Sequence, residues 1–526
     1  MEQSNSEDSR RGPASPKSKR GWLLLLILSA VILRLPAFVN PVIDEDEAFY
    51  ATAARLVTHG GKLYQDAVEL KPPLLIYFYA LGFSIFGNDL RLLHGVTVIW
   101  VLATAAGLGG IARQLSSKWE AAYLSALLYV LFTPTFVPQA LSTNGEILLN
   151  LPLAIGAFLF LKSEPRQRHA LLFLSGVGCG LAFLFKYQGG IFLAVILVYI
   201  LVTKPWLAKR WPDKIAGLQS LLVIGGFASV LISLYAIFRY LGNWEDFYFW
   251  GWKFNFIFME DFTPRYFFQR LLAHAPRFFL IWLVLWIFTF MAIRKALRAP
   301  RDVPPGYHLI MLWLLGSVLA VGVGGKFFGH YFIQLLPPLT VLTDVAIIDW
   351  SLAHDSTPNV KWKRRAVLAG IIIPPIIYLG VNWREEQKRM NGENRYFQSI
   401  ATEVQKLSAP ADKIFIWGRM PELYYFSQRL PASRFITGNF VVGMTTYNFA
   451  DTSARYDSSQ MAPMLNLLLK DLAKNHPKLI IDTAPQNIRQ FGKYPISGIA
   501  PLQHFISNNY HLVATLDRLA IYAAEF

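Results

Sequence analysis

The chain has 526 residues, of which 54% are hydrophobic, 15% are aromatic and only 16% are charged. This charged share is well below the roughly 25% of an ordinary soluble domain, so the composition excludes a fully soluble protein and indicates a membrane protein. The net charge of +16 would suit nucleic acid, but the basic residues stand in short clusters between apolar runs, which orientation in a membrane explains better. The single cysteine, Cys179, excludes an intrachain disulfide.

Long apolar runs dominate the chain, and a helix needs about 17 to 25 such residues to cross the hydrocarbon core. The N-terminal run has a basic start but no small-residue cleavage site after it, so we expect a retained signal-anchor. A shorter, aromatic-rich run at 73–86 predicts an interfacial helix. The predicted spans are about eleven: 21–40, 92–112, 120–138, 145–161, 169–185, 189–203, 217–238, 278–293, 308–325, 331–349 and 366–383.

Basic residues mark every second connection between these spans. If residues 1–20 are cytoplasmic, the positive-inside rule is satisfied at each cytoplasmic loop. The outer side then receives the polar residues that look unusual for their surroundings. The cytoplasmic clusters are Arg113 and Lys118; Lys162, Arg166 and Arg168; Lys204, Lys209, Arg210 and Lys214; Arg294, Lys295, Arg298 and Arg301; and Lys361, Lys363, Arg364 and Arg365.

The predicted fold is a polytopic α-helical membrane protein with a small C-terminal α/β domain. We expect a cytoplasmic basic tail at 1–20, a transmembrane domain at 21–383 with a first outer loop at about 41–90, and an outer domain at 384–526. In the outer domain the alternating patterns predict strands at 413–418, 478–483 and 519–526 and a helix at 421–428.

Four consecutive acids, Asp44, Glu45, Asp46 and Glu47, follow the first span. Acids are favoured in a first helical turn, so a structural reading is that they start a solvated helix. The functional reading is that at least one carboxylate, held at the membrane surface, acts as a general base or orients a sugar hydroxyl.

Several cations on the outer side have two readings. Lys71 either snorkels to lipid headgroups or neutralises a lipid phosphate leaving group. In the loop at about 239–277, the default is an aromatic belt, but Lys253, Arg265 and Arg270 could serve an anionic headgroup. Lys186 interrupts an apolar stretch at the outer end of the fifth span, where it is either functional or close enough to the end to snorkel.

The remaining polar residues open two of the predicted spans. Asn144 and Glu146 precede the fourth, where Asn144 suits a helix cap. His330 and Tyr331 stand at the start of the tenth beside Lys326, and a lone histidine in such a place often binds nothing. The acids are too scattered for metal-ligand spacing, so we expect no metal site and no required cofactor, although a divalent metal is not excluded.

Four segments together resemble a known family. In chain order they are DEDEAFYATAARLV, ELKPPLLIYFYALGFSIFG, LAFLFKYQGG and GKFFGHYFIQLLPPL. They resemble membrane glycosyltransferases of the protein O-mannosyltransferase superfamily, including the lipid A aminoarabinose transferases, and are particularly similar to bacterial glycosyltransferase family 39 relatives. The match covers most of 20–350, and the segment IFIWGRMPELYYFSQRLPASRFIT resembles the outer domain of some bacterial members.

The resemblance implies a GT-C fold and a sugar donor linked to a polyprenyl phosphate. It places Asp46 and Glu47 in the catalytic acidic motif, with Asp46 as the base, while Asp44-Glu45 offers a second acidic pair two residues earlier. Lys71, in its KPP context, matches a phosphate-contacting lysine, and Arg265 and Lys326 are expected to assist it. The substrate-binding residues expected beside them are Tyr50, Asn144, Glu146, Lys186, His330 and Tyr331.

We therefore expect an inverting glycosyltransferase that moves a sugar from a polyprenyl-phosphate donor to a hydroxyl of a glycan, lipid or protein acceptor, in a bacterial inner membrane with its C-terminal domain outside. One alternative is a flippase or transporter of lipid-linked sugars, which would place charges near mid-span and repeat its helices. Another is a ligase or polymerase that uses a polyprenyl-diphosphate donor. No nucleic-acid partner is expected.

Overall fold

The computed structural model describes residues 16–163, 168–209, 211–258, 263–353, 360–444 and 458–525. The predicted basic tail therefore lies mostly outside the described residues, as do Arg166 and Arg210. Each of the eleven predicted spans is helical over most of its length. The corresponding helices are α1 (Pro16–Arg34), α4 (Leu90–Ser116), α5 (Trp119–Phe132), α6 (Gly145–Ser163), α7 (His169–Phe185), α8 (Ile191–Val198), α10 (Lys214–Leu241), α14 (Leu283–Arg298), α15 (Gly306–Gly322), α16 (Leu336–Ala353) and α17 (Val360–Arg389).

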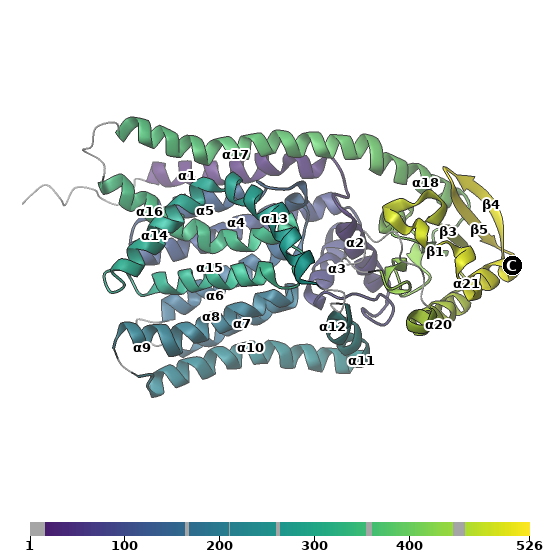
Figure 1. Ribbon diagram of the computed structural model, residues 1–526, viewed down its shortest axis with the longest axis horizontal. Coiled ribbons are helices and arrows are strands. Elements are labelled where there is room, and N and C mark those ends of the chain that lie inside the picture. Colours follow the sequence, from purple (N-terminus) through teal and green to yellow (C-terminus); the bar gives the residue numbers. More distant parts are fainter. Residues whose placement is uncertain are drawn as a thin grey trace, which may run out of the picture.

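These helices form a bundle whose long axis is the long axis of the molecule (Figure 1). Within the described ranges, seven helical stretches are long and apolar enough to cross a membrane alone, and α5, α7 and α15 are shorter apolar helices. The α8 stretch continues through Tyr199–Thr203 into α9 (Lys204–Leu207). The chain is thus a multi-pass membrane protein with about the predicted number of spans.

Three helix boundaries differ from the predicted ones because of prolines and a sharp bend. The span at 120–138 stops being helical at Phe132, because Pro134 follows closely and disfavours helix in the residue before it. The span at 331–349 begins its α-helix only at Leu336, directly before two prolines that suit a first helical turn. The span at 278–293 is wrong at its start, since α13 (Pro264–Ile281) meets α14 at 85°.

Glycines allow α7 to approach its neighbours closely. A Cβ at Gly226 of α10 would lie 1.9 Å from the carbonyl oxygen of Phe173, and one at Gly176 of α7 would lie 2.0 Å from that of Val223. Both obstacles are backbone atoms, so these glycines set the distance between α7 and α10, as small residues do where membrane helices cross.

Short helices of the outer loops lie between the bundle and the C-terminal domain (Figure 1). α17 runs the length of the bundle and leads, through Met390–Asn394, into α18 at the start of that domain (Figure 1). The loop helices are α2 (Glu45–Thr58), α3 (Pro73–Phe86), α11 (Trp244–Asp246) and α12 (Phe254–Phe258).

The C-terminal domain is a five-stranded mixed sheet with helices, and its strand order is β2-β1-β3-β5-β4. β1 pairs in parallel with β2 and β3, whereas β5 is antiparallel to β3 and β4. The predicted strands and the predicted helix are all present; β4 and the two-residue β2 are additions. The elements are α18 (Arg395–Lys406), β1 (Lys413–Trp417), α19 (Pro421–Ser427), β2 (Leu430–Pro431), α20 (Ser458–Asn475), β3 (Leu479–Asp482), α21 (Ala500–Asn509), β4 (Tyr510–Leu516) and β5 (Leu519–Ala524).

Hydrogen bonds fasten this domain to the first outer loop. Arg55 of α2 donates to the carbonyl of Gln428 at 2.8 Å, and the amide of Val68 donates to the carbonyl of Arg434 at 2.9 Å. The Tyr425 hydroxyl accepts from the amide of Leu90 at 3.3 Å. The sheet domain therefore packs directly against the segment that carries the four acids.

Neighbouring glycines of α10 test the close helix packing. Gly226→Ala should lower the free energy of unfolding by about 1–3 kcal/mol, because the added methyl meets a backbone carbonyl that cannot turn aside. Gly225→Ala is the matched control, since its Cβ would meet nothing closer than the Phe173 ring at 4.0 Å, and it should be neutral or slightly stabilising. Thermal unfolding of the purified protein in detergent measures both, and equal melting temperatures would contradict the packing argument.

Candidate active site

The four acids at the start of α2 have four different surroundings. Asp44 is the N-cap residue, and its carboxylate accepts a hydrogen bond from the amide of Glu47 at 2.9 Å. Burial and the neighbouring carboxylates Asp46 and Glu47 raise the pKa of Asp44 to about 8. Asp44 therefore keeps its proton at neutral pH, which removes part of the repulsion in the cluster.

Glu47 points into the protein and is only 1% exposed. One carboxylate oxygen accepts from the amide of Ile43 at 3.1 Å, and the other accepts from the amide of Thr143 at 3.0 Å. His94 Nε2 of α4 lies 2.9 Å from the same oxygen as Thr143. Glu47 lines neither of the cavities described below, so its place is that of a positioning residue that ties α2 to α4 and to the turn before α6.

Unlike Glu47, Asp46 faces a cavity. Its carboxylate lies 3.0 Å from Lys71 Nζ and accepts a hydrogen bond from the Tyr50 hydroxyl at 3.2 Å. Tyr50 stands one helical turn after Asp46, and its hydroxyl also contacts Lys71 Nζ. Partial desolvation at the cavity opposes ionisation of Asp46, whose side chain is 58% exposed, but the charge and hydrogen bond of Lys71 outweigh it and lower the pKa of Asp46 to about 2.

Glu45 attaches the C-terminal domain to α2. Its carboxylate accepts two hydrogen bonds from Arg419, at 2.9 and 2.7 Å, and lies 3.5 Å from Arg489 Nε. Arg489 also pairs with Glu422, which is only 2% exposed, at 2.5 Å and with Glu393 at 3.1 Å. This charged network joins the residue directly before Asp46 to three separate segments of the chain.

The cavity in front of Asp46 has a volume of about 290 Å³. The transmembrane domain contributes its charged wall, with Asp46, Lys71, Lys186 and Lys326. The C-terminal domain supplies the facing wall. The residues of that wall are Arg419, Thr437, Asn439 and Phe440.

A smaller cavity adjoins the first, because Asp46, Tyr50, Lys71, Lys186 and Tyr331 line both. Glu146 and His330 are found on its wall and stand 3.7 Å apart, Oε1 to Nε2. Lys186 is paired with Glu146, and its ammonium group lies 3.5 Å from the centre of the Tyr331 ring. Asn144 also lines this cavity while its side chain accepts from the amide of Ile147, which makes it the N-cap of α6.

The loop before α16 carries Lys326 to the main cavity. Gly324 and Gly325 both have positive φ, of 77° and 60°, which residues with a Cβ rarely adopt. Burial and the positive charges of Lys71 and Lys186 lower the pKa of Lys326 to about 8. Arg270 of α13 supports this loop by donating to the carbonyl of Lys326 at 3.2 Å.

Of the eleven predicted site residues, nine line one or both cavities; Glu47 and Arg265 do not. Arg265 is exposed at the start of α13. Sequence reasoning did not select the residues of the C-terminal wall, nor Glu69 and Asn255. Glu69 stands two residues before Lys71, and burial raises the pKa of its carboxyl to about 7. Only the structure shows this burial, so the sequence alone offered no reason to select Glu69.

The side-chain oxygen of Asn439 is buried and, within the described part of the chain, accepts no hydrogen bond. Asn439 lines the main cavity, so a small turn of its amide would let this oxygen accept a hydrogen bond from a ligand hydroxyl. Among the described residues, no group of three or more His, Cys, Asp or Glu side chains is placed to hold a metal ion.

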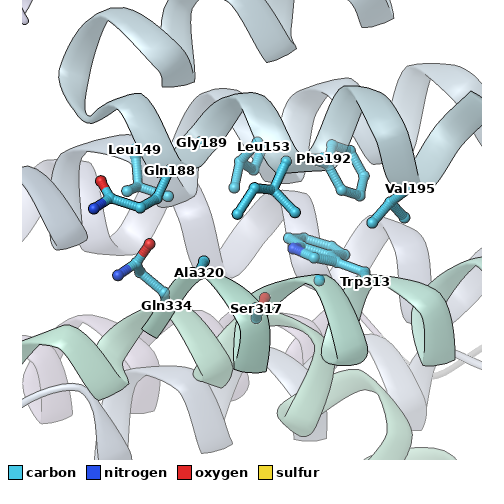
Figure 2. Close-up of a pocket in the computed structure, with 12 residues that line it drawn as sticks. Leu149, Leu153, Gln188, Gly189, Phe192, Val195, Trp313, Ser317, Ala320 and Gln334 are labelled. Carbon is cyan, nitrogen blue, oxygen red and sulfur yellow. The ribbon is translucent and has the colours of Figure 1, made fainter. Parts of the chain in front are cut away.

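A small apolar pocket, with a volume of about 10 Å³, shares one lining residue with the main cavity (Figure 2). Gln188 lines both, and in Figure 2 it stands with Gln334 at one end of the pocket. Farther along, Leu153, Phe192 and Trp313 form an apolar lining from α6, α8 and α15. A charged cavity is thus adjacent to an apolar pocket inside the bundle.

Comparisons with known proteins agree with this architecture. The family model described as dolichyl-phosphate-mannose-protein mannosyltransferase matches residues 70–241. The crystal structure of ArnT from Cupriavidus metallidurans bound to undecaprenyl phosphate is similar with a TM-score of 0.62 at 16% identity, covering 96% of this chain and 98% of that one. No curated protein sequence matches the chain significantly.

A second similar structure is the archaeal oligosaccharyltransferase AglB from Archaeoglobus fulgidus, in complex with an inhibitory peptide and a dolichol-phosphate. Its TM-score is 0.52 at 11% identity, and the match covers 97% of this chain and 75% of that one. The protein therefore has the GT-C fold of membrane glycosyltransferases, completed by a small C-terminal sheet domain.

The network around Glu45 gives a stability prediction. Arg489→Met should lower the free energy of unfolding by about 3 kcal/mol, because it leaves the buried Glu422 carboxylate without its cation. The loss should be smaller at pH 5 than at pH 8, since Glu422 without Arg489 takes up a proton more readily as the pH falls. Arg239→Met is the control: it removes an exposed pair with Glu245 and should cost below about 1 kcal/mol. Similar melting temperatures for the two variants would contradict the network's role.

Proposed function

We propose that the protein is an inverting glycosyltransferase that moves a sugar from a polyprenyl-phosphate donor to an acceptor hydroxyl on the outer side of a bacterial inner membrane. The observation that carries the proposal is the Asp46–Lys71 pair on the wall of a cavity between the bundle and the C-terminal domain. A carboxylate and a cation at one site suit a displacement that needs a base for the acceptor and a counter-charge for a phosphate.

The proposed reaction is a single displacement. Asp46 takes the proton of the acceptor hydroxyl while that oxygen attacks the anomeric carbon of the donor sugar. The bond from the anomeric carbon to the phosphate oxygen breaks on the opposite face, so the configuration inverts. Polyprenyl phosphate leaves with the bonding electrons, and Lys71, with Lys326 in the same cavity, stabilises its negative charge.

Lys71 also explains how Asp46 would become a useful base. A carboxylate with a pKa near 2 holds protons weakly, and Lys71 is the group that lowers it. A donor phosphate that attracts Lys71 would weaken this pair, and its own negative charge would raise the pKa of Asp46 further. Donor binding would therefore activate the base only when the leaving group is in place.

The apolar pocket next to the cavity has a volume of only about 10 Å³, about that of one water, so it marks the apolar boundary of the site and is too small for a polyprenyl chain. Gln188 lines both the cavity and this pocket, so a phosphate near Lys71 would lie next to the apolar interior of the bundle (Figure 2). The ArnT and AglB structures named above were solved with undecaprenyl phosphate and dolichol-phosphate. These ligands support a lipid-phosphate donor for this chain.

The orientation rests on charge. α9 and the last turns of α14 lie at the side of the bundle farthest from the C-terminal domain (Figure 1). These segments carry Lys204, Arg294, Lys295 and Arg298. By the positive-inside rule this end is cytoplasmic. The cavity and the C-terminal domain then lie in the periplasm.

Two substitutions test the proposed roles. Asp46→Asn should lower kcat by about 10²–10⁴-fold, because it removes the base, and Lys71→Ala should lower it by about 10²-fold or more, because it removes the counter-charge of the leaving group. Transfer of labelled sugar from synthetic polyprenyl-phosphate sugars in proteoliposomes measures both. Asp349→Asn and Lys406→Ala, which are exposed and line neither cavity, are the matched controls.

Three outcomes would contradict this assignment. Turnover that survives Asp46→Asn would require another base, and a requirement for diphosphate donors would favour a ligase or polymerase. Labelled lipid that crosses the bilayer without loss of its sugar would identify a transporter.

The pH dependence tests Lys326. Because its pKa is lowered to about 8, the folded protein loses this positive charge as the pH rises through 8. The donor phosphodiester keeps its single negative charge in this range, so KM for the donor should rise between pH 7 and pH 9. Lys326→Arg should flatten this rise, since a guanidinium stays protonated. An identical pH profile in the wild type and in Lys326→Arg would argue against phosphate contact by Lys326.

A further inference from the structure

A second polar cleft, with a volume of about 510 Å³, lies between the end of α2 and the C-terminal domain. One wall comes from the first outer loop and the other from β1, β2, the segment after it and α20. None of its lining residues lines the catalytic cavities. The residues that line it are Leu56, His59, Gly60, Gly61, Gln65, Asp66, Lys413, Leu430, Pro431, Ala432, Ser433, Arg434, Lys470, Asp471, Lys474 and Asn475.

Positive charge is in excess in this cleft, with four Lys and Arg side chains against two Asp side chains. Arg434 and Asp471 neutralise each other through two hydrogen bonds of 2.9 Å. Lys413 donates to the neutral amide oxygen of Asn475 at 2.9 Å. The uncompensated charges are therefore lysines.

Lys470 and Lys474 are four residues apart in α20, so they share one face of the helix. Both are exposed, and within the described part of the chain neither forms an ion pair. Like charges at this spacing destabilise a helix. An anion between them would remove the repulsion, which gives a physical reason for binding.

Gln65 provides the second feature of the cleft. Its side-chain oxygen is buried and, among the described residues, receives no hydrogen bond. Turned toward the cleft that Gln65 lines, this unpaired acceptor, together with the exposed lysines, fits a ligand that carries both an anionic group and hydroxyl donors. A sugar with a phosphate or a carboxylate has this combination, whereas a simple ion has only the first part.

The distance to Asp46 restricts the role of the ligand. His59 in the cleft is thirteen positions after Asp46, and the rise of about 1.5 Å per residue along α2 makes this about 20 Å. A group bound here is too far away to react at Asp46. We propose that the cleft binds an anionic sugar of an extended acceptor glycan, held by Lys470 and Lys474 with Gln65, while a distant hydroxyl of the same acceptor reaches the catalytic cavity. This identification of the ligand as acceptor rests on the proposed glycosyl transfer.

Binding to the full-length protein in nanodiscs, without donor, tests the cleft directly. The probes are glucose 6-phosphate, glucuronate, glucose and inorganic phosphate, each measured by calorimetry, and the first two distinguish a phosphate from a carboxylate ligand. We expect one of the two anionic sugars to bind more tightly than glucose or inorganic phosphate. The double variant Lys470→Gln/Lys474→Gln should weaken its binding by about ten-fold or more, because two charged contacts are lost.

The control is Lys388→Gln/Lys406→Gln, which removes the same charge from exposed positions outside the cleft and should bind as the wild type does. Melting temperatures verify that both variants fold. Equal binding by the two double variants, or no preference for an anionic sugar over glucose and inorganic phosphate, would overturn the proposal. Tighter binding of inorganic phosphate than of either sugar would likewise overturn it in favour of a simple anion site.

Kinetics then separate this proposal from the proposed function. With an anionic acceptor, the Lys470→Gln/Lys474→Gln variant should raise KM for the acceptor and leave kcat near the wild-type value. Asp46→Asn should bind the sugar probe normally and lose transfer. A wild type that binds the probe and transfers no sugar would contradict the transferase alone, whereas transfer with an unchanged acceptor KM would contradict the cleft alone.

Discussion

The buried carboxylate of Glu47 is the contact on which the site depends. It accepts hydrogen bonds from the amides of Ile43 and Thr143 and lies beside His94. One side chain therefore connects the start of α2, the turn before α6 and the helix α4. A buried acid without these partners would be strongly unfavourable. The position of α2 is therefore narrowly defined, and with it the direction of every side chain in its first turn.

That first turn distributes its acids by helical geometry. Successive residues of an α-helix point about 100° apart, so neighbours cannot share one environment. Asp44 caps the helix, Glu45 reaches Arg419, Asp46 faces the cavity and Glu47 is buried. The four adjacent carboxylates thus have four different places: a helix cap, a contact with the C-terminal domain, a cavity wall and the protein interior.

The C-terminal domain is part of this arrangement rather than an appendage. Arg419 binds the residue next to Asp46 and also lines the cavity, and Asn439 adds an unpaired amide oxygen on the same wall. Docking the domain therefore closes one cavity at the start of α2. At the other end of the same helix it forms the basic cleft around Lys470 and Lys474. One interface accordingly borders two cavities, at opposite ends of α2 and about 20 Å apart along that helix.

Local pattern was enough to identify the helical membrane fold, the positions of the apolar helices and the inner strands of the C-terminal sheet. Hydropathy and periodicity depend on near neighbours in the chain, so a buried strand such as Lys413–Trp417 is readable without its partners. The 85° bend between α13 and α14 was not readable, because the apolar run at 278–293 begins inside α13 and continues into α14 without a visible break. The family resemblance named Asp46 as the base, but local pattern alone did not separate Asp46 from Glu47. Nor could it place Arg419 beside Glu45, a residue 374 positions away. Such contacts between distant segments depend on how whole elements pack, and only the tertiary structure decides which carboxylate faces the cavity and which is buried.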